Sequence, residues 1–338
     1  SPRAALVYKP TEFRSARISY NRAFSTPTSL NFFLDISAGL APSDALAALG
    51  YTVRAHGTGA DGYGWRNSSG QFYGMKSPFH SDPGQTLPIS PNFLWAAAVG
   101  ALQAGGQIDA QTAGLLNMLD PSNLGIMTLN TSNFQLTPLE QSVVPSVPGI
   151  RESYTETFEV GWQGVIGRRL QVSADLYYTK KNDFISPLLI QNPLITLNGQ
   201  DVGGRLLASP LPGILVQQFM SRGADLATAT AMATAAVTDL ATGLASVPGG
   251  VQASDEIASQ QADIIVTYRN IGDIDFWGAD LAFSYFLDDK WTVSGSYSHV
   301  SEDWFEVPGY NPLALNAPTQ KGSFSVAYRN ALSGINAE

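Results

Sequence analysis

Apolar and polar residues alternate from Tyr154 to Tyr178, and Gly167 and Arg168 divide this stretch into two arms. Successive side chains of a β-strand point to opposite faces. Each arm therefore predicts a strand with one apolar and one polar face, and the interruption predicts a tight turn. The apolar face of this predicted hairpin carries Tyr154, Phe158, Val160, Trp162, Leu170, Val172, Ala174, Leu176 and Tyr178.

Aromatic residues recur near both ends of the apolar rows. Tyr154 and Trp162 are eight residues apart, which corresponds to roughly 20 Å of height for a strand tilted by about 40°. The apolar band of an outer-membrane barrel is about 25 Å tall and lies between two aromatic girdles. We therefore predict that the apolar face contacts lipid and that its girdle residues are Tyr154, Trp162, Tyr178, Trp277, Tyr285, Trp291 and Tyr297.

The same alternation, together with turn-forming residues, predicts about seven membrane-spanning strands joined by short turns on one side and long connections on the other. Further hairpins are expected at 3–24 and 277–300, and a last strand at about 322–328. The long connections comprise about 125 residues after Phe24 and about 80 after Phe184. Short turns on one side and long extracellular loops on the other are typical of outer-membrane barrels.

We expect the whole chain, 1–338, to form part of an outer-membrane barrel, with long extracellular loops at 25–150 and 185–262. Helices are the expected content of both loops, because long structureless insertions are uncommon. Ser43 and Ser90 are candidate N-caps of two helices in the first loop, and Gly50 is a candidate stop. In the second loop one helix face is predicted from Leu226, Ala229, Ala233, Val237, Leu240 and Leu244.

Composition excludes several classes of protein. Charged residues make up only 14% of the chain, against about 25% in a typical soluble domain. No stretch of about 20 apolar residues predicts a transmembrane helix, and residues 1–20 lack the apolar core of a signal peptide. Cysteine is absent, which excludes disulfides and thiolate metal sites. The net charge of -9 argues against nucleic-acid binding.

Few residue patterns suggest chemistry. Gly57–Gly62 matches G-x-G-x-x-G, but turn-forming residues follow it instead of a helix, so we interpret it as an extracellular loop tip. His299, Glu302 and Asp303 are close in sequence, yet their spacing fits no defined metal motif. We expect no catalytic residues, no metal and no cofactor.

Four groups of residues stand in a familiar order: 1–10 with 17–24 and 26–27; 156–161 with 170–185; 268–272 with 278–280, Tyr285, Trp291 and 297–298; and 317–328. These groups resemble successive strands in the barrel of TonB-dependent outer-membrane receptors, and together they cover somewhat under half of the chain. Ser25 departs from the resemblance, because it stands where the family often has a basic residue. The resemblance implies an all-β fold, a portion of an antiparallel transmembrane β-barrel of 22 strands, in the bacterial outer membrane.

The resemblance also implies partners. Family members carry an N-terminal plug with a segment that engages the TonB complex, and neither is recognisable in this chain. We therefore expect a central to C-terminal portion of a receptor, whose plug and remaining strands lie outside this sequence. Seven strands are too few for a closed bacterial barrel, and open edges in lipid would cost several kcal/mol per unpaired backbone group. Membrane lipid is a further expected partner, and a surface protein docking on the helical loops is another candidate.

The polar face of the predicted strands is expected to line a wet lumen, with Glu159, Gln163, Gln171, Asp175 and Asp280 facing inward. Solute contacts in receptors of this kind are expected on the loops and the plug apex. Aromatic loop residues are therefore the candidates for ligand contact: Tyr63, Trp65, Phe72, Tyr73 and Trp304.

The leading hypothesis is an outer-membrane receptor that takes up a scarce solute by TonB-coupled active transport. The alternative is a passive porin, or a structural or adhesive surface barrel. A soluble β-rich enzyme or binding protein is a third class. Iron chelates, cobalamin, nickel complexes, oligosaccharides and peptides all remain open as the solute.

Overall fold

The computed structural model describes residues 2–41, 43–130, 135–306, 312–315, 317–329 and 336–337. Ser1, which begins the first segment of the resemblance, lies outside these residues, as do Pro42 and residues 131–134 of the predicted loop 25–150. The chain forms two compact units. The sheet unit comprises Ser1–Thr28, Ile150–Ser186 and Arg269–Glu338, and the insert unit comprises Ser29–Gly149 and Pro187–Tyr268.

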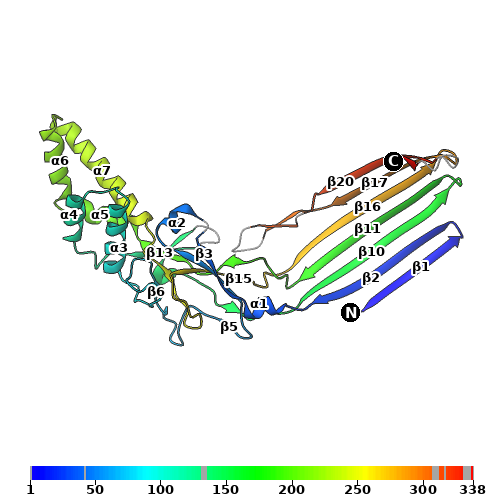
Figure 1. Ribbon diagram of the computed structural model, residues 1–338, viewed down its shortest axis with the longest axis horizontal. Coiled ribbons are helices and arrows are strands. Elements are labelled where there is room, and N and C mark those ends of the chain that lie inside the picture. Colours follow the sequence, from blue (N-terminus) through cyan, green and yellow to red (C-terminus); the bar gives the residue numbers. More distant parts are fainter. Residues whose placement is uncertain are drawn as a thin grey trace. The chain divides into compact units, whose positions relative to one another are not determined.

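The sheet unit is built on one eight-stranded antiparallel sheet whose strands lie side by side in chain order (Figure 1). The predicted hairpins are present, and seven of the eight strands are long. Among the described residues no pairing joins β1 to β21, so the sheet is open. Its strands are β1 (Arg3–Thr11), β2 (Arg14–Ser25), β10 (Ser153–Ile166), β11 (Leu170–Asn182), β16 (Ile274–Phe286), β17 (Trp291–Val300), β20 (Gln320–Arg329) and β21 (Asn336–Ala337).

Local chemistry explains two of the tight turns. Gly167 and Arg168 both adopt positive φ, of 59° and 63°, as a two-residue hairpin turn between twisted strands requires. Between β16 and β17, Asp288 accepts hydrogen bonds of 2.8 Å from the backbone N–H groups of Lys290 and Trp291. These bonds stabilise the carboxylate and lower the pKa of Asp288.

The insert unit contains two further sheets, which the sequence analysis does not predict. One has the order β12-β15-β4-β3, with β15 and β4 parallel, and the other has the order β6-β14-β13-β7-β8. The all-β expectation fits the sheet unit, and the insert unit combines the helices expected in the long loops with these additional strands. Its main strands are β3 (Asp35–Leu40), β4 (Thr52–His56), β6 (Met75–Lys76), β7 (Ile126–Leu129), β8 (Leu136–Pro138), β12 (Leu189–Ile190), β13 (Leu194–Leu197), β14 (Gly250–Gln252) and β15 (Asp263–Thr267).

Two small pairings complete the strands. In the insert unit β5 (Gly62–Tyr63) pairs with β9 (Val147–Pro148). In the sheet unit β18 (Trp304–Phe305) pairs with β19 (Leu313–Ala314).

The helices of the described residues all belong to the insert unit. They are α1 (Ser29–Phe33), α2 (Asp44–Ala48), α3 (Pro91–Ala104), α4 (Ala110–Asn117), α5 (Gly199–Leu207), α6 (Leu211–Ser221), α7 (Leu226–Ser246) and the 3₁₀ turn η1 (Leu139–Gln141). The helices predicted after Ser43, after Ser90 and around Ala233 are confirmed. Across the described residues, none of these helices combines the length and apolar content that crossing a membrane would require.

The main core of the insert unit forms where α3, α4, α5 and α7 pack around β13. It includes Leu94, Trp95, Val99, Leu116, Ile195, Leu206 and Leu244. The predicted apolar face of α7 is largely correct, because Ala229, Ala233, Val237 and Leu244 are buried. Leu226 is the exception. It is 61% exposed, because it is the first residue of the helix, beyond the reach of the core.

Candidate functional site

The pairing register gathers the apolar positions of the long strands on one face. Across the sheet, Leu6, Ile18, Val160, Leu176 and Ala279 stand opposite one another in a single row. These apolar side chains are not covered by any described part of the chain, which is unusual for a water-soluble surface of this extent. Those that are clearly exposed on this face include Leu6, Ile18, Phe158, Val160, Leu176, Leu281, Phe324 and Val326.

Aromatic side chains cluster toward both ends of the apolar face. At one end Tyr178 stands opposite Trp277, whose ring centroid lies 5.1 Å from that of His299. At the other end the rings of Trp291 and Tyr328 are 4.8 Å apart. The register places all the girdle candidates on this face: Tyr154, Trp162, Tyr178, Trp277, Tyr285, Trp291 and Tyr297.

The opposite face of the same strands is polar. Arg17 Nη2 forms ion pairs with Glu159 Oε1 and, at 3.0 Å, with Asp175 Oδ1. Gly161 makes room for this cluster, because a Cβ there would lie 2.2 Å from the Asp175 carboxylate. Arg17 of β2 thus pairs with carboxylates on two other strands, Glu159 on β10 and Asp175 on β11.

A further carboxylate adjoins this cluster. Asp280 stands directly opposite Asp175 in the β11–β16 pairing. This cluster of one arginine and three carboxylates carries net negative charge. The candidate lumen residues Glu159, Gln163, Gln171, Asp175 and Asp280 all share this face.

Serine pairs extend the polar face toward the C-terminal strands. The hydroxyls of Ser284 and Ser294 are 3.1 Å apart, and those of Ser296 and Ser323 are 2.7 Å apart. Hydroxyl groups that hydrogen-bond to one another and remain accessible to solvent are suited to a hydrated surface. The sheet therefore has one apolar face and one polar face.

Two of the aromatic ligand-contact candidates lie inside the insert unit. Tyr63 and Trp65 are 5% and 1% exposed and pack with Val147 and Ile257. Their rings meet edge to face at 5.6 Å. Tyr63 belongs to β5, and Trp65 follows it closely. Their packing partners Val147 and Ile257 are remote in the sequence, so the local pattern gives no indication that the two rings are buried.

The interpretation of Gly57–Gly62 as a loop tip fits only the exposed turn at Ala60 and Asp61, because the glycines at both ends are closely packed. A Cβ at Gly57 would lie 2.5 Å from the backbone of Phe32, and one at Gly62 would lie 2.0 Å from the carbonyl oxygen of Val147. Gly62 also adopts φ of 79°, which favours glycine. These glycines allow close packing of backbone segments within the insert unit.

The remaining aromatic candidates are more accessible. The guanidinium of Arg66 lies 3.5 Å from the centre of the Phe72 ring, which is a cation–π contact. Phe72 and Tyr73 are half-buried. Trp304 is 62% exposed and belongs to the sheet unit.

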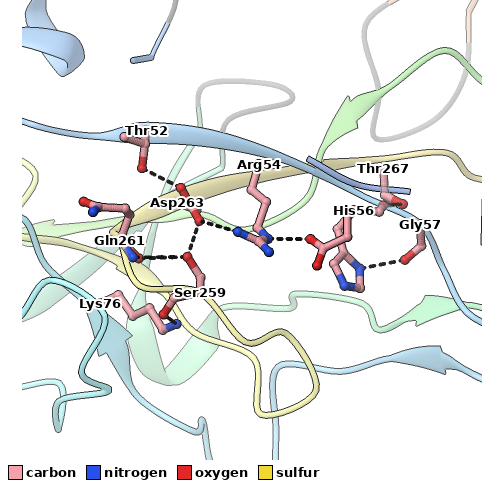
Figure 2. A network of polar contacts seen from close by, with 10 residues as sticks. Thr52, Arg54, His56, Gly57, Lys76, Ser259, Gln261, Asp263 and Thr267 are labelled. Atoms are coloured by element: carbon pink, nitrogen blue, oxygen red, sulfur yellow. Dashed lines mark hydrogen bonds and ion pairs between the residues drawn. The ribbon is translucent and has the colours of Figure 1, made fainter. Parts of the chain in front are cut away.

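The insert unit also contains a buried polar network centred on Asp263 (Figure 2). The Asp263 side chain is 2% exposed. Its carboxylate accepts hydrogen bonds from the hydroxyls of Thr52 and Ser259, and Arg54 Nη1 lies 3.9 Å from Oδ2. Arg54 also donates from Nε to Asp35 Oδ1 at 2.6 Å. The network thereby ties β15 to β4 and β3.

The charges of this network perturb one another. The hydrogen bond between Arg54 and Asp35 raises the pKa of the arginine and lowers that of the carboxyl. Lys76 is almost fully buried and donates from Nζ to the Ser259 carbonyl at 2.8 Å. Burial lowers the pKa of Lys76, because a charged ammonium is less stable away from water.

The hydrogen bonds of this network suit a structural role better than a catalytic one. The Ser259 hydroxyl donates a hydrogen bond to the Asp263 carboxylate, and the nearby Lys76 contacts the Ser259 carbonyl instead of this hydroxyl. The sequence pattern does not single out Asp263. A charged residue immediately before the apolar run Ile264–Val266 is the signal that could have found it.

Within the described ranges, no three His, Asp or Glu side chains gather closely enough to hold a metal ion. His299 contacts Trp277 on the apolar face instead.

A comparison with known protein families finds a match over almost the whole chain. A family model described as TonB dependent receptor-like, beta-barrel matches residues 1–337. No curated protein matches the chain.

Solved structures with weak similarity include the alcaligin outer-membrane receptor FauA from Bordetella pertussis, at 12% identity and a TM-score of 0.31, over 98% of this chain and 27% of that one. The monoaromatic hydrocarbon channel CymD matches at 11% identity and a TM-score of 0.25, over 97% of this chain and 54% of that one. A deletion mutant of the monoaromatic hydrocarbon channel TodX matches at 9% identity and a TM-score of 0.21, over 98% of this chain and 60% of that one.

The chain thus spans about a quarter of the length of FauA. Since the family model covers nearly every residue, the chain belongs to the family of TonB-dependent receptor-like β-barrels.

Proposed function

We propose that this chain forms part of the wall and the external cap of a receptor that takes up a scarce solute by TonB-coupled active transport. Membership of the family assigns the protein to the bacterial outer membrane, as a receptor or transporter. The finer proposal is that the wall belongs to a 22-stranded barrel around a plug, and that the TonB complex supplies the energy. The chain itself makes and breaks no bonds in this process.

The observation that carries the proposal is the sidedness of the long sheet. One face is apolar with aromatic ends, and the other holds the Arg17 ion cluster and the serine pairs. A lipid-facing exterior and a hydrated interior require this alternation in every strand. Because unpaired strand edges are costly in lipid, β1 and β21 would pair with strands outside this sequence.

Chain direction supports an external position for the insert unit. The tight turns after β1, β10 and β16 all lie at one end of the antiparallel sheet. The insert unit leaves from the opposite end, after β2 and β11. In outer-membrane barrels the long connections face the outside of the cell. We therefore propose that the segments 25–150 and 185–262 are extracellular.

Accessible aromatic side chains are the proposed solute contacts. Phe72, Tyr73 and Trp304 keep this role, because their rings remain partly or largely exposed. The exposed side of α7 is the proposed surface for a partner protein.

Cysteine labelling tests which face is hydrated. The chain contains no cysteine, so Ser173→Cys on the polar face and Leu176→Cys on the apolar face can be compared directly. A charged methanethiosulfonate is expected to label Ser173→Cys faster by on the order of tenfold or more, because only a hydrated thiol ionises readily. Equal labelling rates in the receptor embedded in its membrane would contradict the assignment of the two faces.

TonB coupling is tested by growth. Cells lacking the receptor and cells lacking TonB are supplied with ferric chelates, cobalamin, nickel complexes, oligosaccharides or peptides, each as the sole source of its nutrient. Both deletions are expected to abolish growth on the same solute at low concentration. Growth that requires the receptor and persists without TonB would indicate a passive channel and overturn the proposal.

A further inference from the structure

The insert unit contains a large apolar pocket away from the buried polar network. Its volume is about 750 Å³. The walls come from α2, β3, β4, β7, β8, β12, β13 and β15, together with the C-terminal end of α7. The principal side chains on these walls are Leu46, Val53, Leu129, Ile190, Leu194 and Ile264.

The chemistry of the lining is uniform. All the lining residues lie in the described part of the insert unit, and none of them is charged. Two lining hydroxyls already have partners, since Thr196 donates to the carbonyls of Ala245 and Val247, and Ser246 donates to that of Gly243. The walls therefore offer little to a charged ligand and a large contact surface to a neutral apolar one.

The size of the pocket distinguishes it from a packing defect. Protein interiors contain few voids larger than a water molecule, whereas small-molecule sites commonly have volumes of about 300–1,000 Å³ and mostly apolar walls. Residues of helices and strands that are distant in the sequence come together to form this pocket. Several of them also belong to a hydrophobic core that continues beneath it. A concave site with a well-packed floor suits a small molecule better than the flat surface of a protein.

Apolar side chains also remain open at the rim. Leu40 and Leu136 line the pocket, and they are 64% and 54% exposed. They belong to the insert unit, so the apolar face of the long sheet does not account for them. Bound apolar ligand would remove these side chains from water.

We propose that this pocket binds a neutral apolar small molecule, of an aliphatic or aromatic hydrocarbon type. The binding site lies within the insert unit and does not require that the same molecule be transported. It therefore goes beyond the proposed uptake function.

Photolabelling tests the site. The receptor containing this chain is placed in lipid nanodiscs and irradiated with an uncharged twelve-carbon alkyl diazirine, and labelled peptides are identified by mass spectrometry. Saturable labelling is expected on peptides that contain Leu46, Leu129 and Ile190. Labelling of the lipid-facing strands is expected to rise without saturation, because the probe merely partitions into the bilayer there.

Two alanines on α2 provide a matched pair of variants. Ala45 lines the pocket and Ala48 does not, and both are exposed. Ala45→Phe is expected to reduce saturable labelling at least about fivefold by filling the hollow, whereas Ala48→Phe leaves it unchanged. Ala38→Trp, at a second exposed lining position, is expected to act like Ala45→Phe.

Competition distinguishes the sources of the ligand. Displacement of the probe by decane alone would support a free hydrocarbon, and displacement also by a lysophospholipid would support the acyl chain of a lipid. Linear labelling of the pocket peptides, or equal saturable labelling in Ala45→Phe and Ala48→Phe, would overturn the proposal. These outcomes do not depend on TonB, so failure here is separable from failure of the uptake proposal.

Discussion

Leu281→Arg is expected to prevent most of the receptor from assembling in the outer membrane. Leu281 lies near the middle of β16 on the apolar face and is 46% exposed. An arginine on the lipid face near the bilayer midplane costs about 2–4 kcal/mol. That is a large fraction of the stability of a typical domain, about 5–15 kcal/mol. The expected result is a loss of folded, heat-modifiable protein from the outer-membrane fraction on unheated gels.

Ser296→Arg is the matched control. Ser296 stands opposite Ala282, the neighbour of Leu281, and faces the polar side of the sheet. Since we propose that this side is hydrated, the same charge is expected to leave assembly close to normal. If Leu281→Arg assembled as well as Ser296→Arg, the apolar face would not contact lipid.

The strands of the long sheet were predictable because their information is local. Alternation from Tyr154 to Tyr178 is sufficient to assign both strands and their faces, and Gly167 with Arg168 marks the turn between them. The helix after Ser90 was predictable for the same reason, since Pro91 fixes its start.

The sheets of the insert unit depend on contacts that are remote in the sequence. β15 pairs with β4 across more than two hundred residues, and neither short strand carries an alternation long enough to identify it. Trp65 is similarly buried by Ile257 and Ile265, which belong to the far half of the chain. Aromatic residues between glycines have no local feature that separates a buried ring from a ligand contact.

The register of the long sheet was only partly predictable. Alternation separates polar from apolar faces, but it does not specify that Arg17 meets both Glu159 and Asp175. That contact depends on the pairing of β2 with β10, two strands separated by most of the insert unit. Alternation likewise does not specify the number of strands in a barrel.

The buried position of Asp263 leads to the second large expected effect, on the stability of the insert unit. Asp263→Ala removes the carboxylate that faces Arg54 and accepts hydrogen bonds from Thr52 and Ser259. Removing one partner of a buried charge pair is expected to cost about 3–5 kcal/mol, because Arg54 keeps only Asp35 and the hydroxyls of Thr52 and Ser259 lose their acceptor. Backbone amides of β4 and β15 should then exchange with deuterium roughly 100 to several thousand times faster.

Asp35→Asn provides the contrast, because Asp35 contacts the same arginine from the surface. Its side chain is 49% exposed, and exposed ion pairs contribute at most about 1 kcal/mol. Arg54 lowers the pKa of Asp35, so the stabilisation is present above the ordinary carboxyl pKa of about 3.9 and is lost as the pH falls through the lower folded value. At neutral pH the Asp35→Asn variant should therefore show exchange only slightly faster than the unmodified chain, whereas Asp263→Ala shows the full effect. Similar exchange rates in the two variants would mean that burial does not set the strength of this network.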